Sequence, residues 1–132
     1  MSADPTGGKA DQAAATAIVR HYFDALVARD WIRLSTLLAA DVVRNGPYGD
    51  DFEGRDEYVG FLRSTFATLR DYDLRIRSIS GGATTAVAEI TETVTMNGAR
   101  LATDEAIVFE VGESAITRVG VYLQASYDPT ES

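Results

Sequence analysis

The sequence predicts an α+β fold in which three helices precede a run of antiparallel strands. Up to Leu69 the apolar residues recur at helical spacing, and after Tyr72 the period changes to two. Two long alternating segments then meet at Asn97-Gly98, a strong signal for a two-residue hairpin turn. Helices gathered ahead of strands are typical of a domain whose helices pack on one face of a sheet.

The chain of 132 residues is long enough for one domain with one core. Residues 1–10 have no apolar period, so we expect a flexible tail there and a second one over residues 127–132. The single domain is expected over residues 11–126.

Each of the three helices has a start signal. Asp11 precedes the first apolar stripe, and Asp30 precedes the second helix, WIRLSTLLAA. Gly54 starts the third helix, whose first turn carries Asp56 and Glu57 near the positive end of the helix dipole. The spacing predicts that the inner face of this third helix consists of Tyr58, Leu62, Phe66 and Leu69.

The strands are predicted from alternation. A short strand begins at DVV, and YDLRIRSIS places Leu74, Ile76 and Ser78 on one face. The segments TTAVAEITETVTM and RLATDEAIVFEV form the long hairpin, and AITRVGVYLQ forms the last strand.

Composition excludes several classes of function. The net charge of −8 argues against a nucleic-acid groove, because that affinity comes largely from neutralising phosphates. No apolar run is long enough to cross a bilayer and no leader pattern opens the chain, so we expect a cytoplasmic protein without membrane contact. With no cysteine and one histidine, and with no nucleotide or phosphate motif, we expect neither a metal site nor a cofactor.

Two glutamates interrupt the apolar face of the long hairpin. Glu92 lies among the inward residues of the first strand, and Glu105 lies among those of the second. With a two-residue turn at Asn97-Gly98, Glu92 pairs with Thr103 and Ile90 pairs with Glu105. The two acids are then diagonal neighbours with Cα atoms roughly 7–8 Å apart.

Such a pair suits acid–base chemistry. Burial raises the pKa of a carboxyl group, and a neighbouring negative charge raises one of the two further. The pair can then supply one proton donor and one acceptor near neutral pH. The alternative is that either glutamate is solvated near the end of the sheet or paired with an arginine.

The element order, the segment HYFDALVARDW and the segment GRDEYVGFL together resemble the NTF2-like superfamily over residues 12–124. Within it, the chain is similar to the SnoaL-like polyketide cyclases, the ketosteroid isomerases and the limonene-epoxide-hydrolase-like proteins. The resemblance implies a cone in which a strongly curved mixed sheet surrounds a deep pocket closed by the three helices.

The match to the isomerases implies roles for two residues. Tyr22 stands where they carry a tyrosine that donates to the substrate oxyanion, and Glu105 stands where they carry a protonated acid that donates the second bond. Gly46, in NGPYG, stands where they carry the catalytic base. A SnoaL-like cyclase needs only a base and oxyanion donors, and Glu92 or an acid of the Asp50-Asp51 pair is a candidate base.

The match to the epoxide hydrolases is partial. Glu92 stands at their strand acid, but Ile90 replaces the arginine expected two residues earlier, and Val121 stands where a second acid is expected. Arg44 and Gly46 replace their tyrosine and asparagine.

The first hypothesis for function is a cofactor-independent isomerase or cyclase that works through an enolate of a hydrophobic cyclic or polyketide-like substrate. Tyr22, Glu92 and Glu105 are its catalytic residues. The alternatives are an epoxide hydrolase or epoxide-opening cyclase, and a non-catalytic ligand-binding or dimerisation module. Residues expected to contact the substrate are Leu26, Trp31, Arg44, Tyr48, Asp51, Phe66, Ile90, Thr103 and Val121.

The resemblance also implies a homodimer through the exposed face of the sheet. Candidate contacts on that face are Thr91, Thr93, Ala106, Val108 and Tyr122.

Overall fold

The computed structural model describes the backbone of residues 5–130 and the side chains of residues 14–130. Its helices are α1 (Pro5–Ala28), α2 (Trp31–Thr36) and α3 (Arg55–Phe66). Its strands are β1 (Leu38–Asn45), β2 (Phe52–Glu53), β3 (Arg70–Gly81), β4 (Thr85–Met96), β5 (Ala99–Val111) and β6 (Ile116–Tyr127).

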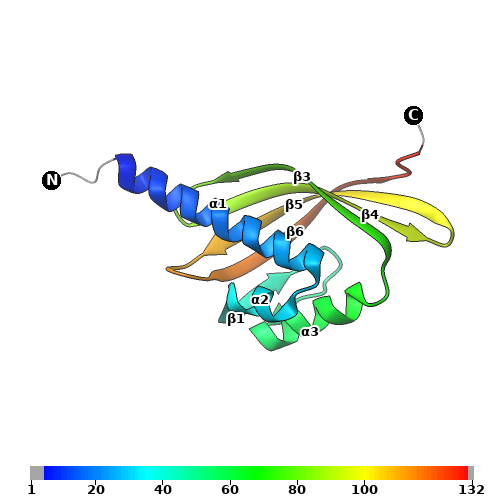
Figure 1. The fold of residues 1–132 in the computed structure, drawn as a ribbon, viewed down its shortest axis with the longest axis horizontal. Coiled ribbons are helices and arrows are strands. Elements are labelled where there is room, and N and C mark those ends of the chain that lie inside the picture. Colours follow the sequence, from blue (N-terminus) through cyan, green and yellow to red (C-terminus); the bar gives the residue numbers. More distant parts are fainter. Residues whose placement is uncertain (1–4, 131–132) are drawn as a thin grey trace.

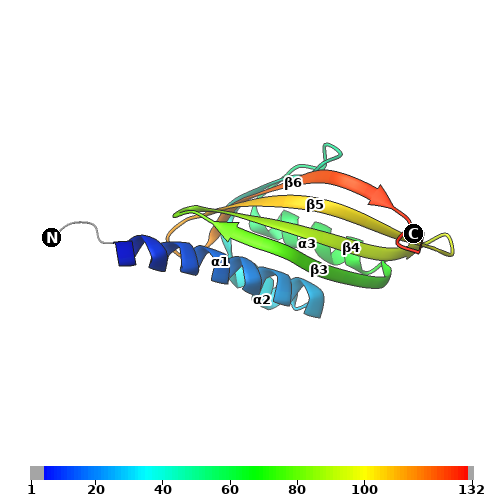
Figure 2. The same ribbon diagram turned by 90° about the horizontal axis from the view of Figure 1, so that it is seen from above.

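The strands form one six-stranded mixed sheet in the order β2-β1-β6-β5-β4-β3. Only β1 and β6 run parallel, and the other neighbours are antiparallel. The sheet is a curved layer, with α1 along β3 and β4 and with α3 against β1 (Figures 1 and 2). This arrangement confirms the predicted α+β class and the helix-covered mixed sheet.

Two helix boundaries differ from those predicted. Helix α1 begins at Pro5, so residues 5–10 of the predicted tail are helical, and residues 1–4 lie outside the described residues. Proline is tolerated in a first helical turn, but the Gly-Gly pair that follows is a poor helix former, and for this reason the sequence pattern did not predict a helix there. Helix α2 ends at Thr36 instead of continuing to Ala40, because buried Leu38 already belongs to β1 beside β6.

The hairpin register is the one predicted. Met96 pairs with Ala99, Glu92 pairs with Thr103, and Ile90 pairs with Glu105. Asn97 and Gly98 have φ values of 52° and 80°, the two positive values that this turn type requires.

The alternation predicted for β3 is wrong beyond Ile76. The register of β3 against β4 passes from Ile76–Ile90 to Ser78–Glu89, so Arg77 is the extra residue of a β-bulge. Ser78 therefore faces solvent, where its hydroxyl donates to Glu89 at 3.4 Å, and Ile79 takes the inner position.

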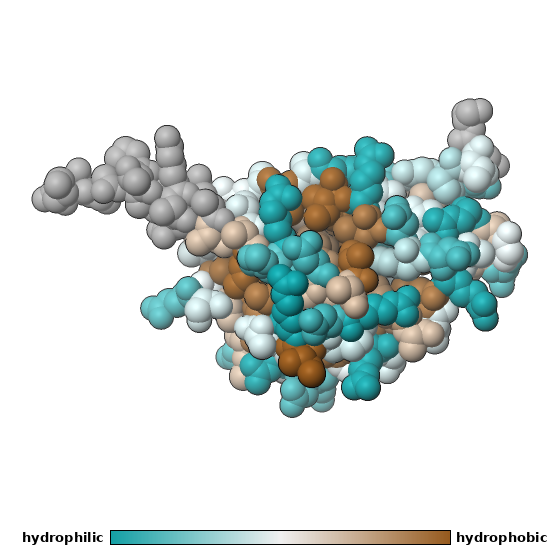
Figure 3. All heavy atoms as spheres, viewed as in Figure 1, coloured by the Kyte–Doolittle hydropathy of each residue, from teal (hydrophilic) through white to brown (hydrophobic). Residues whose placement is uncertain are grey.

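The core lies between α1 and the inner face of the sheet. Phe23 and Phe109 are buried there, with ring centroids 5.7 Å apart in an edge-to-face arrangement. On the face of the molecule that Figure 3 shows, hydrophobic residues lie in separate patches among hydrophilic ones. In the described part of the chain, no helix is long and apolar enough to cross a bilayer.

The five residues proposed for dimerisation lie on strands β4, β5 and β6, at positions that alternate with the inward ones. Tyr122 is 60% exposed, and the Thr91 hydroxyl donates to Asp104 at 2.6 Å. Dimerisation through this face stays a prediction.

Two glycine substitutions should have opposite effects on stability. Gly98→Ala forces alanine into the left-handed region and should lower the free energy of unfolding by about 1–2 kcal/mol. Gly60→Ala, in the exposed middle of α3 with open space around its Cα, should raise it by about 0.5–1 kcal/mol. Urea denaturation measures both. A stabilised Gly98→Ala protein would contradict the turn geometry.

Candidate active site

A cavity of about 250 Å³ lies between the helices and the inner face of the sheet. Apolar side chains from α1, α3, β5 and β6 form most of its wall, among them Phe23, Leu62, Ile107 and Val119. Polar groups enter the wall from α1, α3 and strands β1, β3, β4 and β5. They are Tyr22, Arg44, Tyr58, Thr65, Tyr72, Glu92, Thr103 and Glu105.

The two glutamates lie on the same wall of this cavity. Their diagonal placement follows from the hairpin register, and Glu105 is only 8% exposed. The Tyr72 hydroxyl, from β3, donates a hydrogen bond to Oε2 of Glu92. Glu92 therefore accepts a hydrogen bond from Tyr72 on its β3 side and faces Glu105 on its β5 side.

The pair holds a proton at neutral pH. Burial, the hydrogen bond with Glu92 and the charge of Glu92 together raise the pKa of Glu105 to about 9. Arg44 acts in the opposite direction but does not cancel these effects. Glu105 is thus a neutral carboxylic acid that can donate a hydrogen bond, and Glu92 is the acceptor beside it.

Two tyrosines on different helices share a hydrogen bond in the cavity. The hydroxyls of Tyr22, in α1, and Tyr58, in α3, are partners, and both side chains are buried. Burial raises the pKa of both hydroxyl groups. They stay protonated through the physiological range, and one of the two hydroxyl protons is free to point into the cavity.

Arg44 forms an ion pair with Asp50. Its Nη1 donates to the backbone oxygen of Asp50 at 2.9 Å and to Oδ2 of Asp50 at 2.7 Å. Its guanidinium lies over the Phe61 ring, 4.9 Å from the centroid. Burial alone would raise the pKa of Asp50, but the bonds from Arg44 and from the Tyr48 N–H outweigh it and lower that pKa.

Gly46 makes room for this ion pair. A Cβ at residue 46 would overlap the carboxylate of Asp50. The space that a side chain at position 46 would enter is therefore filled by an acid from four residues further along the chain. A larger residue at 46 would displace Asp50 from Arg44.

The mouth of the cavity lies under the segment 46–50. A second hollow of about 240 Å³ is lined there by Pro47, Tyr48 and Asp50. It shares Arg44, Glu92, Thr103, Glu105 and Val121 with the cavity, so it leads to the carboxyl pair from outside.

Most of the residues predicted to contact a substrate line the cavity, but three do not. Trp31 packs edge-to-face on Phe66, with centroids 5.6 Å apart, and lies outside the cavity. Tyr48 is 78% exposed and contributes only to the mouth. Asp51 is exposed and accepts from Asn45 Nδ2 at 3.3 Å. The residues that do line the cavity are Leu26, Arg44, Phe66, Ile90, Thr103 and Val121.

Three polar residues of the site were missed or misjudged from sequence. Tyr58 was assigned to the inner face of its helix as core, although its hydroxyl needs a partner when buried. Tyr72 has the same alternation as Leu74 and Ile76, so its inward direction could have been inferred. No pattern in the sequence distinguishes Asp50 from Asp51, because the loop conformation decides between them.

The arrangement offers a proton donor, a proton acceptor and neutral hydroxyl donors within one apolar enclosure. Across the residues whose side chains are described, no group of three His, Asp or Glu side chains is placed to hold a metal ion. The chemistry available from the side chains themselves is transfer of a proton and stabilisation of a developing oxyanion.

A curved sheet closed by three helices around such a cavity is the NTF2-like architecture. The SnoaL-like domain family matches residues 19–119, and the chain belongs to this family. None of the curated proteins matches it.

Solved structures with the same fold include proteins of several proposed activities. A proposed ketosteroid isomerase from Kribbella flavida DSM 17836 is 25% identical, with 92% of this chain and 86% of that chain covered and a TM-score of 0.76. An LEH-like epoxide hydrolase from M. tuberculosis is 20% identical, with coverages of 86% and 84% and a TM-score of 0.75. A proposed polyketide cyclase from Xanthomonas campestris is 25% identical, with coverages of 86% and 93% and a TM-score of 0.70.

Replacing Glu105 should change how stability depends on pH. The pKa of Glu105 is raised from 4.5 to about 9 on folding, so between these values the folded protein binds the extra proton. Wild-type stability should then fall as pH rises through this window, by up to about 1.4 kcal/mol per pH unit. Glu105→Gln imitates the protonated acid, so its stability should be flatter with pH and higher than wild type near pH 9.

Urea denaturation at a series of pH values measures this difference. Glu110→Gln, a change at an exposed glutamate on the same strand, is the matched control and should run parallel to wild type. Parallel curves for Glu105→Gln and wild type would show that Glu105 is ionised in the folded protein.

Proposed function

We propose that this protein is a cofactor-independent acid–base enzyme that forms an enolate from a small, mostly apolar cyclic ketone. The observation that carries the proposal is that buried Glu105, whose pKa is raised to about 9, lies beside Glu92 on one wall of a mostly apolar cavity. An isomerase or a cyclase then differs only in what the enolate does next.

The residues divide into an acceptor and two donors. The carboxylate of Glu92 takes the proton from the carbon next to the carbonyl, and the electron pair of that C–H bond moves to the carbonyl oxygen. When the substrate binds, the O–H of Glu105 turns from Glu92 to the carbonyl oxygen, and Glu105 and Tyr22 then donate hydrogen bonds to the resulting oxyanion. The proton returns to a different carbon in isomerisation, or the enolate carbon attacks a second carbonyl in cyclisation.

The remaining polar groups support these roles. Tyr72 holds Glu92 by its hydrogen bond, and Tyr58 is the partner that orients Tyr22. Arg44 is occupied by Asp50 and does not take the place of the proton between the glutamates.

The size of the cavity limits the substrate. A volume of about 250 Å³ is below the range of roughly 300–1,000 Å³ that is usual for drug-sized ligands. A compound of one or two rings that presents one carbonyl oxygen to the single cluster of polar groups suits the volume; cyclisation needs a second carbonyl elsewhere in the compound. The apolar wall would bury the rings and leave the oxygen facing Tyr22 and Glu105.

Epoxide opening is a second candidate, because a donor beside an acceptor could also protonate an epoxide oxygen while activating water. Against it, the arginine and the second acid expected from the epoxide hydrolases are the apolar residues Ile90 and Val121, both in the cavity wall. Hydrolysis of cyclohexene oxide to its diol, without any exchange activity on a ketone, would favour this candidate.

Deuterium exchange tests the enolate without knowledge of the natural substrate. In D₂O the wild-type protein should exchange the hydrogens next to the carbonyl of 2-tetralone faster than buffer, as followed by proton NMR. Glu92→Gln removes the acceptor and should slow the enzymatic rate by about 10²–10⁴-fold. Tyr22→Phe should slow it by about 10²–10³-fold, because an oxyanion donor is lost.

The control is Glu110→Gln, which removes an exposed carboxylate outside the cavity and should leave the rate unchanged. A folded wild-type protein that exchanges no faster than buffer would overturn the proposed function. Full activity in Glu92→Gln would exclude Glu92 as the proton acceptor.

A further inference from the structure

Two β-bulges lie on either side of the hairpin pair that contains Glu105. In β3, Arg77 is the extra residue between Ile76 and Ser78. In β6, the partners of Asp104 and Glu105 are Ala125 and Leu123, so Gln124 is the extra residue there. Bulges re-aim neighbouring side chains and are frequent next to active sites.

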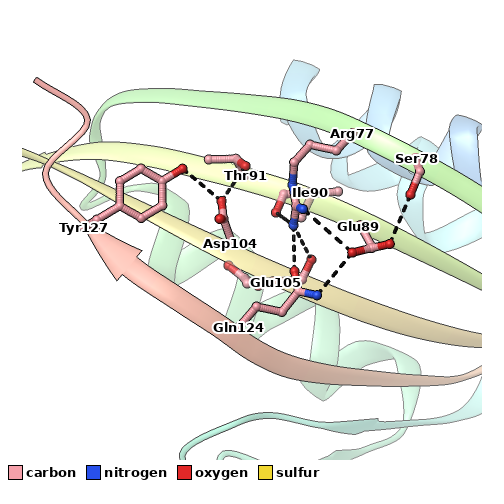
Figure 4. Close-up of polar contacts among 9 residues, drawn as sticks. All are labelled: Arg77, Ser78, Glu89, Ile90, Thr91, Asp104, Glu105, Gln124 and Tyr127. Carbon is pink, nitrogen blue, oxygen red and sulfur yellow. Dashed lines mark hydrogen bonds and ion pairs between the residues drawn. The ribbon is translucent and has the colours of Figure 1, made fainter. Parts of the chain in front are cut away.

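The two bulge residues meet on the outer face of the sheet, as Figure 4 shows. Arg77 Nη2 donates to Oε1 of Gln124 at 2.7 Å, although two strands separate β3 from β6. Gln124 Nε2 in turn donates to Oε2 of Glu89 at 3.2 Å, and Glu89 lies 3.7 Å from Arg77 Nη1. We call Arg77, Glu89 and Gln124 the outer clamp.

Arg77 of the outer clamp contacts the backbone of Ile90 and Glu105. Arg77 Nη2 donates to the backbone oxygen of Ile90 at 3.0 Å and also lies 3.4 Å from the backbone oxygen of Glu105. These residues face each other in the β4–β5 ladder. A carbonyl oxygen has two lone pairs, so it can accept from Arg77 in addition to the ladder.

We propose that Arg77 is a positioning residue that fixes the backbone of Glu105 from the outer face and so holds its carboxyl group beside Glu92 inside the cavity. This inference rests on the proposed function. The Glu105 side chain leaves the backbone on the face opposite to Arg77, so its direction follows the local twist of β5. A catalytic group has to be held within about 0.5 Å of its working position, and hydrogen bonds from neighbouring residues that do not touch the substrate supply part of that support.

The charged groups around Glu105 and Arg77 determine in which direction the pKa of Glu105 changes when Arg77 is replaced. The groups that face Glu105 are Glu92 from β4, Tyr72 from β3 and Arg44 from β1. Those around Arg77 are Glu89 and Asp104, and Arg75 also acts on Asp104. Removing the positive charge of Arg77 would by itself raise the pKa of Glu105. If the Glu105 carboxyl group moves away from Glu92 and out of the apolar wall, the pKa of Glu105 falls.

The experiment is a carbon-13 NMR titration of the glutamate carboxyl groups, with the Glu105 signal assigned by its absence in Glu105→Gln. In Arg77→Gln the pKa of Glu105 should fall by about one unit or more, toward an ordinary carboxyl value. Arg77→Lys should show the same fall in pKa, because lysine keeps the charge but its one nitrogen cannot take the places of both Nη2, at the carbonyls and Gln124, and Nη1, near Glu89. In Gln124→Leu the pKa of Glu105 should fall by less than in Arg77→Gln.

The matched control is Arg75→Gln on the same strand. Within the described part of the chain the side chain of Arg75 forms no hydrogen bond or ion pair, and Arg75 pairs with Thr91 in the β3–β4 ladder, so this variant loses the same charge but leaves the clamp intact. Its Glu105 pKa should stay at the wild-type value or rise slightly. An unchanged or raised pKa in Arg77→Gln and Arg77→Lys would overturn the proposal, and if Arg77→Gln does not fold, Arg77→Lys and Gln124→Leu decide.

Exchange of 2-tetralone hydrogens in the same variants separates the two proposals. Arg77→Gln should lower kcat about tenfold with little change in KM, and the alkaline limb of its pH profile should move to lower pH. If wild type exchanges nothing, the proposed function fails while the titration still tests the clamp. If wild type is active and Arg77→Gln keeps the wild-type kcat and pH profile, the clamp fails alone.

Discussion

Two carboxyl groups on one apolar wall cannot both be charged, and the rest of the site is organised around that constraint. Glu105 is buried beside Glu92 and keeps its proton, which turns an acid into a hydrogen-bond donor. Tyr72 supplies Glu92 with a donor from the other side. Among the described residues, no fully buried side-chain nitrogen or oxygen lacks a hydrogen-bond partner, although most of the cavity wall is apolar.

Among the residues whose side chains are described, Arg44 is the buried arginine; it lines the same cavity as the pair, and Asp50 binds one nitrogen of its guanidinium. An unoccupied guanidinium beside the glutamates would stabilise both as carboxylates and remove the proton donor. Asp50 counters this effect by binding Nη1 of Arg44 with its backbone and side-chain oxygens at 2.9 and 2.7 Å, and the pKa of Glu105 stays raised. Gly46 leaves room for the carboxylate of Asp50. The glycine in NGPYG therefore permits the Arg44–Asp50 ion pair.

The sequence predicted the parts of the site that follow from local rules. The Asn-Gly turn determined the hairpin register, and alternation then placed Glu92 and Glu105 on one inward face. What it could not predict depends on contacts between distant segments. The bulge at Arg77 reversed the alternation after Ile76, buried Leu38 ended α2 early, and the fold of the 46–50 loop chose Asp50 over Asp51 as the partner of Arg44. Tyr72 lies between these cases, since its alternation indicated an inward side chain but not its bond to Glu92.

The infrared spectrum of the protein in D₂O, recorded as a function of pH, tests most directly whether Glu105 is protonated. A carbonyl stretching band from one protonated carboxylic acid should be present at pH 7. The band should disappear as the pH rises through about 9 and be absent from Glu105→Gln. A wild-type spectrum at pH 7 with carboxylate bands alone would contradict this prediction, because the pair would then hold no proton to donate.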